Sequence, residues 1–149
     1  MIIKFGYYDD EDFGLTAFPE IESNENEIFE NKKINKIKNK DFKKKKKEYT
    51  KYLITGIMED FPDIEIIDIF LPQLEKVETG KLQEAVWDGQ AFQHKINKAK
   101  VEFEHTIFGV CEEYPLWECK FEEYRKVFEG WKKFLGMEVD LKSEVVLVI

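Results

Sequence analysis

Apolar residues recur at steps of three and four in two segments of this chain, which is typical of amphipathic helices. The first segment carries one apolar stripe, made of Phe42, Tyr49, Tyr52, Leu53, Gly56, Ile57 and Phe61. The second carries an aromatic stripe, made of Phe121, Tyr124, Phe128, Trp131 and Leu135. The spacing predicts two main helices, near 43–61 and 120–135. Pro62 should end the first helix, and Gly136 the second.

Shorter apolar segments favour β-strands. We expect these strands near 2–8, 64–71, 82–87, 90–107 and 144–149. Residues 64–71 are apolar at odd and even positions between two prolines, which is typical of a strand covered on both faces. Within 90–107 the apolar positions change from even to odd numbers. A β-bulge near Asn97 or Lys98 would keep them on one face of a bent or interrupted strand.

Turn signals separate these elements. Asp88-Gly89 predicts a two-residue hairpin turn, because both residues can take positive φ. Residues 13–31 are less regular, and Pro19 could open a helical turn carrying Ile21, Ile28 and Phe29. No repeat or linker divides the chain. The pattern therefore predicts a single α+β domain over residues 1–149, with a mostly antiparallel sheet and two main helices.

Composition places the chain among globular proteins. It has 149 residues, of which 15% are aromatic, enough to fill one hydrophobic core. No apolar run approaches the ~20 residues that span a bilayer, and the first residues lack the features of a signal peptide. We expect a cytoplasmic protein without membrane contact. Cys111 and Cys119 are too few for a disulfide framework, so we expect free thiols.

Charge is distributed unevenly in a chain of net charge -8. Residues 32–51 carry eleven lysines and two acids, whereas the segments before and after them are both acidic. The run Lys43–Lys47 could neutralise phosphates, so a nucleic-acid-binding module using Lys43–Lys51 is an alternative function. Most of these lysines lie off the apolar stripe, as on any solvated helix face. We therefore expect that nucleic acid is not the partner.

Few residues suggest chemistry. Asp9 to Glu20 partly match a calcium-binding loop, but Phe13 stands where an oxygen ligand belongs. The only histidines and cysteines are His94, His105, Cys111 and Cys119. They contain no close ligand pair of the kind that structural zinc sites show, and nothing local pairs a cysteine with a histidine as nucleophile and base. Phosphate-binding, dinucleotide-binding and Gly-x-Ser-x-Gly motifs are absent. We therefore expect no catalytic, cofactor-binding or metal-binding residues and no cofactor. A small enzyme without a recognisable motif is a third possible function.

One segment mixes acids with aromatic residues just before the second predicted helix. Its residues, Glu112 to Glu118, read EEYPLWE. Tyr114 and Trp117 could tuck into the core of a plain loop. Alternatively, aromatic side chains within an acidic rim suit recognition of a basic protein.

The stretch CEEYPLWECKFEEYRKVFEGWKKFLGM, residues 111–137, resembles small cytosolic immunity proteins that accompany bacterial polymorphic and contact-dependent inhibition toxins. The resemblance is carried by Trp117, Glu118, Cys119, Gly130-Trp131 and Phe134-Leu135. It implies a non-catalytic protein that binds and blocks a cognate toxin, often a basic nuclease, by covering its substrate-binding surface with acidic side chains. The expected contact residues are then Asp9, Asp10, Glu11, Asp12, Glu112 and Glu113. The lysine-rich face should lie away from the toxin.

Overall fold

The computed structural model describes residues 1–23 and 32–149, with side chains described in 1–23 and 40–149. Its helices and antiparallel sheets give the chain an α+β fold, as predicted. The helices are α1 (Lys32–Tyr49), the π-helical segment η2 (Thr50–Ile54), α2 (Thr55–Asp60), α3 (Ile64–Glu78) and α4 (Phe121–Leu135). The strands are β1 (Ile2–Asp10), β2 (Gly14–Glu22), β3 (Glu84–Asp88), β4 (Phe92–Asn97), β5 (Lys100–His105), β6 (Trp117–Lys120) and β7 (Val145–Val148).

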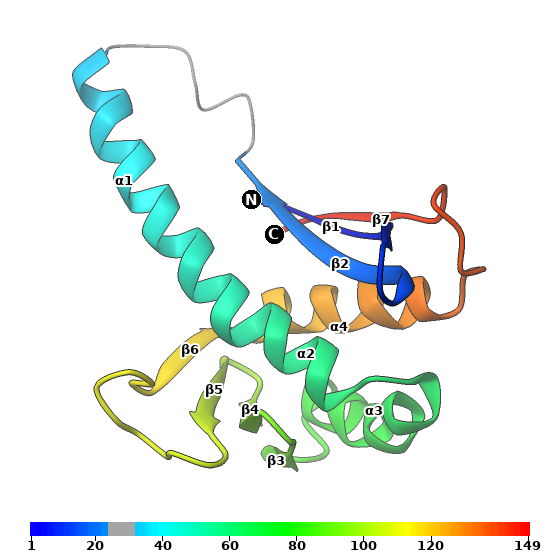
Figure 1. The fold of residues 1–149 in the computed structure, drawn as a ribbon. Coiled ribbons are helices and arrows are strands. Elements are labelled where there is room, and N and C mark those ends of the chain that lie inside the picture. The colour runs from blue at the N-terminus through cyan, green and yellow to red at the C-terminus, as the bar shows by residue number, and fades with distance from the viewer. Residues whose placement is uncertain (24–31) are drawn as a thin grey trace.

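The strands form two antiparallel sheets. One has the order β2-β1-β7, and the other has the order β3-β4-β5-β6. Helix α4 lies between the sheets, with the three-stranded sheet on one side and the four-stranded sheet on the other (Figure 1). Two layers of strands therefore share a helical middle layer, and the core lies around α4.

Helix α4 matches its predicted bounds and buries its aromatic stripe. Trp131 packs on Phe5 of β1 with ring centroids 5.2 Å apart. One end of the same helix turns Tyr124 toward the other sheet, where its ring lies 6.0 Å from that of Phe103 on β5. Because both sheets bury aromatic side chains against α4, solvent reaches mainly one charged face of this helix, made of Glu122, Lys126, Glu129 and Lys133.

The predicted helix near 43–61 is part of a longer helical run that begins at Lys32 and ends at Asp60, just before Pro62. Its predicted stripe is buried, except for the half-buried Phe42. The π-helical segment lies in the middle, and its extra residue per turn lets Tyr52, Leu53 and Ile54 all reach the core.

The strand predicted at 64–71 is wrong, because these residues begin α3. Asp63 caps the helix, its side chain accepting a hydrogen bond from the backbone N–H of Ile66 at 2.9 Å. The buried residues of this helix recur at steps of three and four, and the pattern continues past the end of the predicted strand. They are Ile67, Phe70, Leu74 and Val77. Pro72 lies inside the helix and does not end it. A helix cannot bury every residue of this apolar run, and Ile69 is the apolar residue left on the solvent side, with 67% of its surface exposed.

The strand predicted at 90–107 is two strands, β4 and β5, joined by a tight turn. The expected interruption occurs at the expected place, but it is a turn and the predicted bulge is wrong. The side chain of Asn97 accepts hydrogen bonds from Ala99 N and Lys100 N, at 2.9 and 3.0 Å, and so closes the turn. Reversal of the chain, with Ile96 opposite Val101, keeps both apolar sets on one face.

The predicted hairpin at Asp88-Gly89 forms, but its turn lies two residues later. Gly89 N donates to Phe92 O at 2.9 Å, which leaves Gln90 and Ala91 as the turn residues. Gly89 is not among the glycines with positive φ. It is needed here for its missing side chain, because its Cα faces Asp60.

The helical turn suggested at Pro19 is also wrong. Residues 14–22 form β2, in which Pro19 lies opposite Phe5 of β1. Because β2 is an edge strand, a residue without a backbone N–H costs no ladder hydrogen bond on its free side. Ile28 and Phe29, the other residues of that suggested turn, lie outside the described residues. Strand β6 was not predicted at all.

Candidate functional site

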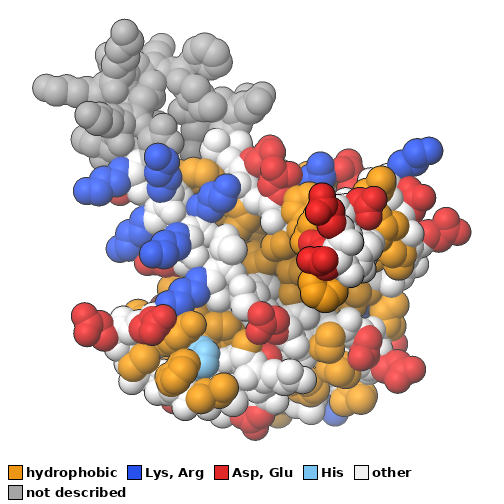
Figure 2. All heavy atoms as spheres, in the orientation of Figure 1, with side chains coloured by type: hydrophobic (Ala, Val, Ile, Leu, Met, Phe, Trp, Pro, Cys, Tyr) orange, Lys and Arg blue, Asp and Glu red, His pale blue; other side chains and the backbone are white. Residues whose placement is uncertain are grey.

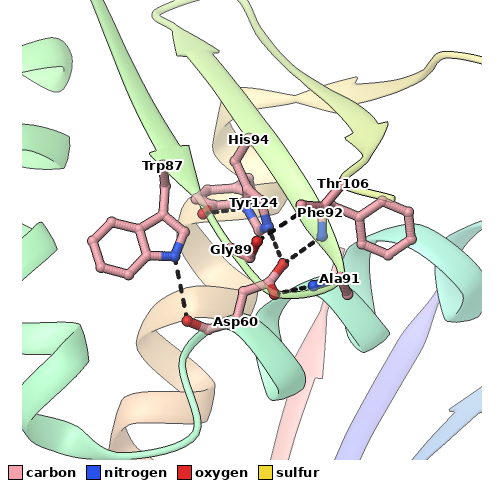
Figure 3. A network of polar contacts seen from close by, with 8 residues as sticks. All are labelled: Asp60, Trp87, Gly89, Ala91, Phe92, His94, Thr106 and Tyr124. Carbon is pink, nitrogen blue, oxygen red and sulfur yellow. Dashed lines mark hydrogen bonds and ion pairs between the residues drawn. The ribbon is translucent and has the colours of Figure 1, made fainter. Parts of the chain in front are cut away.

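A buried carboxylate joins the end of α2 to the turn between β3 and β4. Asp60 has no exposed side-chain surface. Its carboxylate oxygens accept hydrogen bonds from Ala91 N at 2.7 Å and from Phe92 N at 3.1 Å, and one of them also contacts His94 Nε2 at 2.8 Å (Figure 3). The backbone carbonyl of Asp60 accepts a bond from the indole N–H of Trp87 at 3.3 Å. The turn is therefore fixed to the helix by polar contacts within the core.

His94 continues this network to α4. Its Nδ1 lies 3.0 Å from the hydroxyl of Tyr124. Burial lowers the pKa of His94, although hydrogen bonding to Asp60 opposes this effect. The imidazole is therefore neutral at pH 7, with Nε2–H donating to Asp60 and Nδ1 accepting from Tyr124. Burial also raises the pKa of Tyr124, which keeps its hydroxyl protonated as the donor.

An acid, a histidine and a hydroxyl in series are also the parts of a nucleophilic triad. Here, however, His94 and Tyr124 are both 0% exposed, and so is the side chain of Asp60. A substrate cannot reach the Tyr124 oxygen without opening the core. The arrangement joins α2, β4 and α4, and its chemistry is that of a satisfied buried network.

The neutral state of His94 predicts a pH dependence of stability. The unfolded histidine takes up a proton near pH 6.5, whereas the folded one resists protonation. The free energy of unfolding should therefore fall as the pH drops below about 6.5, by up to ~1.4 kcal/mol per pH unit. Urea unfolding between pH 7.5 and 5 measures this slope. It should vanish in His94→Gln and persist in His105→Gln; a parent protein equally stable throughout this window would contradict the assignment.

The network extends to a surface loop through Thr106. Its hydroxyl donates to Gly89 O at 3.1 Å, and its N–H donates to Ala91 O at 3.0 Å (Figure 3). Thr106 begins the connection between β5 and β6, which we call the 106–116 loop. The base of this loop is thus tied to the same turn that Asp60 holds.

The 106–116 loop carries apolar side chains into solvent. The exposed residues are Ile107 at 77%, Phe108 at 63%, Val110 at 58% and Leu116 at 48%. Hydrophobic side chains gather at this end of the four-stranded sheet, below the lysines of α1 in Figure 2. Exposed apolar side chains gathered in this way are a feature of interaction sites.

Hydrogen bonds hold this loop in one conformation. His105 Nδ1 accepts bonds from Ile107 N at 3.2 Å and Phe108 N at 3.1 Å, and Gly109 N donates to His105 O at 2.8 Å. Gly109 has φ of +60°, a conformation that favours glycine. The ring of His105 stacks on that of Phe108 with centroids 4.9 Å apart. These contacts order the backbone beneath the exposed side chains.

The helical run holds the other half of the loop. Tyr52 of η2 donates its hydroxyl hydrogen to Pro115 O at 2.9 Å. Lys51 donates to Glu113 O, and its Nζ lies 3.9 Å from the centroid of the Tyr114 ring. Trp117, at the start of β6, stacks on Tyr52 with centroids 5.3 Å apart. The aromatic residues of EEYPLWE therefore anchor the loop, as the simpler of the two interpretations expected.

The six predicted contact residues fall into two separate places. Glu112 and Glu113 are exposed in the 106–116 loop, whereas Asp9–Asp12 lie at the tip of the β1–β2 hairpin. The tip lies near the C-terminal end of α4, on the opposite side of the view from the loop (Figure 1). The structure therefore does not bring the two acidic groups together.

The hairpin tip is ordered by its own acids. Asp10 accepts hydrogen bonds from Asp12 N at 2.9 Å and Phe13 N at 3.1 Å. These two bonds lower the pKa of Asp10. Glu20, the last position of the possible calcium loop, lies opposite Lys4 in the hairpin, while Asp10 lies opposite Gly14. The acids thus belong to a β-turn and its strands, in which Glu20 lies far from the tip.

The sequence pattern did not predict that the apolar residues of 106–110 (TIFGV) are exposed. Ile107 continues the alternating pattern of β5, and that pattern predicts it on the buried face of a strand. The available signal was Gly109, which interrupts the strand pattern with apolar residues on both sides. A glycine inside an apolar run indicates a turn, and a turn exposes its side chains.

The lysine run lies on α1 with all of Lys43–Lys47 exposed, although the helical spacing placed only most of these lysines off the apolar stripe. Lys44 forms an ion pair with Glu48 at 3.9 Å, and Lys45 Nζ lies 5.1 Å from the centroid of the Tyr49 ring.

Both cysteines are free, as expected. Burial raises the pKa of the Cys119 thiol, so this thiol remains protonated at pH 7.

Within residues 1–23 and 32–149, no helix combines the length and the apolar character needed to cross a membrane. The same part of the chain contains no group of three or more His, Cys, Asp and Glu side chains placed to hold a metal ion. Comparisons with protein-family models, with curated protein sequences and with solved structures gave no match for this chain.

Proposed function

We propose that this protein is a non-catalytic binding protein, an immunity protein that binds and blocks a cognate toxin, with a basic nuclease domain as the expected target. The observation that supports this proposal is the 106–116 loop. Four exposed apolar side chains stand there on an ordered backbone beside Glu112 and Glu113.

Apolar side chains on a fixed backbone favour binding for two reasons. Their burial in a partner gains hydrophobic free energy, and little conformational entropy is lost because the loop is already ordered. Phe108 is the best anchor, since aromatic residues dominate interface energetics and its ring is already stacked on His105.

The acidic groups supply steering. Glu112 and Glu113 flank the apolar anchors, and a chain of net charge -8 attracts a basic target over long range. Asp9–Asp12 form a second candidate contact, separate from the loop. Only a large target would reach both. The exposed lysines of α1 lie just above this loop and would repel a basic surface, so the target should contact the loop from the end that faces away from α1 (Figure 2).

The proposal predicts that the double substitution Ile107→Ser and Phe108→Ser weakens toxin binding. Loss of a central anchor typically costs about 2 kcal/mol or more, which is roughly a 30-fold rise in Kd. Both side chains are largely exposed, so unfolding should change little. The measurement is titration calorimetry with the basic C-terminal domain of a toxin encoded beside this protein.

A matched control removes exposed apolar surface elsewhere. Val139 and Leu141 are 63% and 61% exposed, and Val139→Ser with Leu141→Ser should bind the toxin domain as the parent does. The proposal fails if the parent neither binds nor neutralises the toxin domain, or if the loop variant binds as tightly as the parent. Binding of a generic oligonucleotide that weakens steeply with salt would instead favour the nucleic-acid alternative.

A further inference from the structure

Among the described residues, the last strand of the three-stranded sheet has no partner along one edge. Strand β7 pairs with β1 on one side, and the sheet order β2-β1-β7 leaves its other side open. Met1 and Ile149 exchange both backbone hydrogen bonds, each at 2.9 Å. Because such pairs alternate along an antiparallel ladder, Leu147 and Val145 also bond to β1. The N–H and C=O groups of Val146 and Val148 therefore point away from the sheet.

These outward groups are nearly unused in the described part of the chain. The carbonyl of Val148 accepts one long bond, from Lys126 Nζ at 3.4 Å. The side chains of Val146 and Val148 are 53% and 58% exposed. An exposed, apolar strand edge of this kind is a template for pairing with another strand.

The other strand edges differ from β7. Strand β2, at the far side of the same sheet, contains Pro19 and has glutamates at its end. Strand β3 contacts helix α3, and β6 exposes Glu118 and Lys120. Prolines, charges and covering helices are the usual protection of an edge. The sequence of β7, VVLV, has neither proline nor charge.

The surroundings of β7 suit a second copy of the chain. A shallow groove of about 320 Å³ runs between β7 and α4, and its charged side chains are two lysines and two glutamates, namely Lys126, Lys133, Glu129 and Glu144. This surface is locally neutral in a chain of net charge -8. Two acidic copies can therefore meet here without the repulsion that their net charge causes elsewhere.

We propose that β7 pairs with β7 of a second copy in an antiparallel fashion, around a twofold axis at Leu147. Val146 then lies opposite Val148 of the second copy, and each such pair exchanges both backbone hydrogen bonds. The two three-stranded sheets become one continuous sheet.

Charge favours antiparallel pairing of two β7 strands as well. Glu144 lies at the start of β7, where it pairs with Lys4 at 3.1 Å, and Lys126 lies beside the end of the strand at Val148. Antiparallel pairing brings Glu144 of one copy toward Lys126 of the other. The apolar side chains select the register. A twofold axis at Val146 would place Val148 opposite Glu144, whereas an axis at Leu147 places Val148 opposite Val146 and so pairs two apolar side chains.

Sedimentation analysis of the full chain tests the proposal. The parent should sediment as a dimer at micromolar concentration. Val146→Lys with Val148→Lys places lysines directly opposite one another and should halve the mass. Val146→Glu with Val148→Lys places opposite charges together in the proposed register, and this variant should remain a dimer. Circular dichroism confirms that each variant is folded.

A parent that is monomeric up to about 100 μM would overturn the proposal, because strand pairing with a Kd above that concentration is too weak to form a specific dimer. A folded double-lysine variant that stays dimeric would place the interface elsewhere. If that variant does not fold, Val146→Pro decides, since it removes one outward N–H and leaves the ladder with β1 intact. A dimeric, folded Val146→Pro would equally refute pairing through β7.

Discussion

Replacing Asp60 with asparagine is expected to lower the free energy of unfolding by about 3 kcal/mol. The carboxylate accepts from Ala91 N, Phe92 N and His94 Nε2, all within the core. Asparagine keeps one acceptor oxygen but turns an N–H₂ group toward these donors, so at least one buried donor loses its partner. Urea unfolding followed by tryptophan fluorescence measures the change.

The neighbouring residue provides the matched control. Glu59 is exposed, and Glu59→Gln makes the same chemical change at the surface one residue earlier. It should alter the free energy of unfolding by no more than about 0.5 kcal/mol. Equal stability of Asp60→Asn and Glu59→Gln would show that the buried network contributes nothing to folding.

Gly89→Ala is the second substitution with a large expected effect, a loss of at least about 2 kcal/mol. A Cβ at this position would lie 2.1 Å from the Cγ of Asp60 and 2.4 Å from one of its oxygens. The carboxylate cannot move away without breaking the hydrogen bonds that fix it. Gly6→Ala serves as the control, because its Cβ would meet only the Phe18 ring, at an ordinary 3.6 Å.

The two sites should also be coupled. In an Asp60→Ala background the clashing carboxylate is absent, so Gly89→Ala should cost much less than it does in the parent. A double-mutant cycle by urea unfolding measures this difference. Additive losses would mean that Gly89 is required for a reason other than its approach to Asp60.

Several elements could be predicted because their signal is local. Helix α4 repeats aromatic residues at steps of three and four, and no other structure buries that pattern on one face. Local patterns also predicted the helix that contains Tyr52 and Ile57, and the strands at the two ends of the chain. The hairpin at residues 88–92 followed from its glycine, although the turn itself uses Gln90 and Ala91.

Helix α3 shows where a local pattern is ambiguous. Residues 64–71 are apolar at almost every position, and such a short run fits a buried strand or a buried helix. The packing of Phe70 against Phe61 and Trp87, with ring centroids 5.6 and 5.1 Å away, selects the helix. Tertiary contacts therefore decided an element that neither its composition nor its flanking prolines could specify.

The candidate site was predicted only in part. Glu112 and Glu113 do lie in an exposed loop, but they lie apart from Asp9–Asp12, with which they were grouped. The apolar residues beside them were hidden by the strand pattern of β5. Which side chains of a loop are exposed depends on how its ends are tied down, here by Thr106, His105 and Tyr52.

The sequence by itself determined the α+β class, the aromatic helix α4 and the solvent-exposed face of lysines on α1, because periodicity acts between residues a few positions apart. Only the tertiary structure distinguished Asp60 from the other acids among the thirty-one in the chain. Its partners Ala91, Phe92 and His94 lie 31 to 34 residues further along. A polar side chain becomes structural through burial and complete hydrogen bonding, and both depend on residues that meet only when the chain has folded.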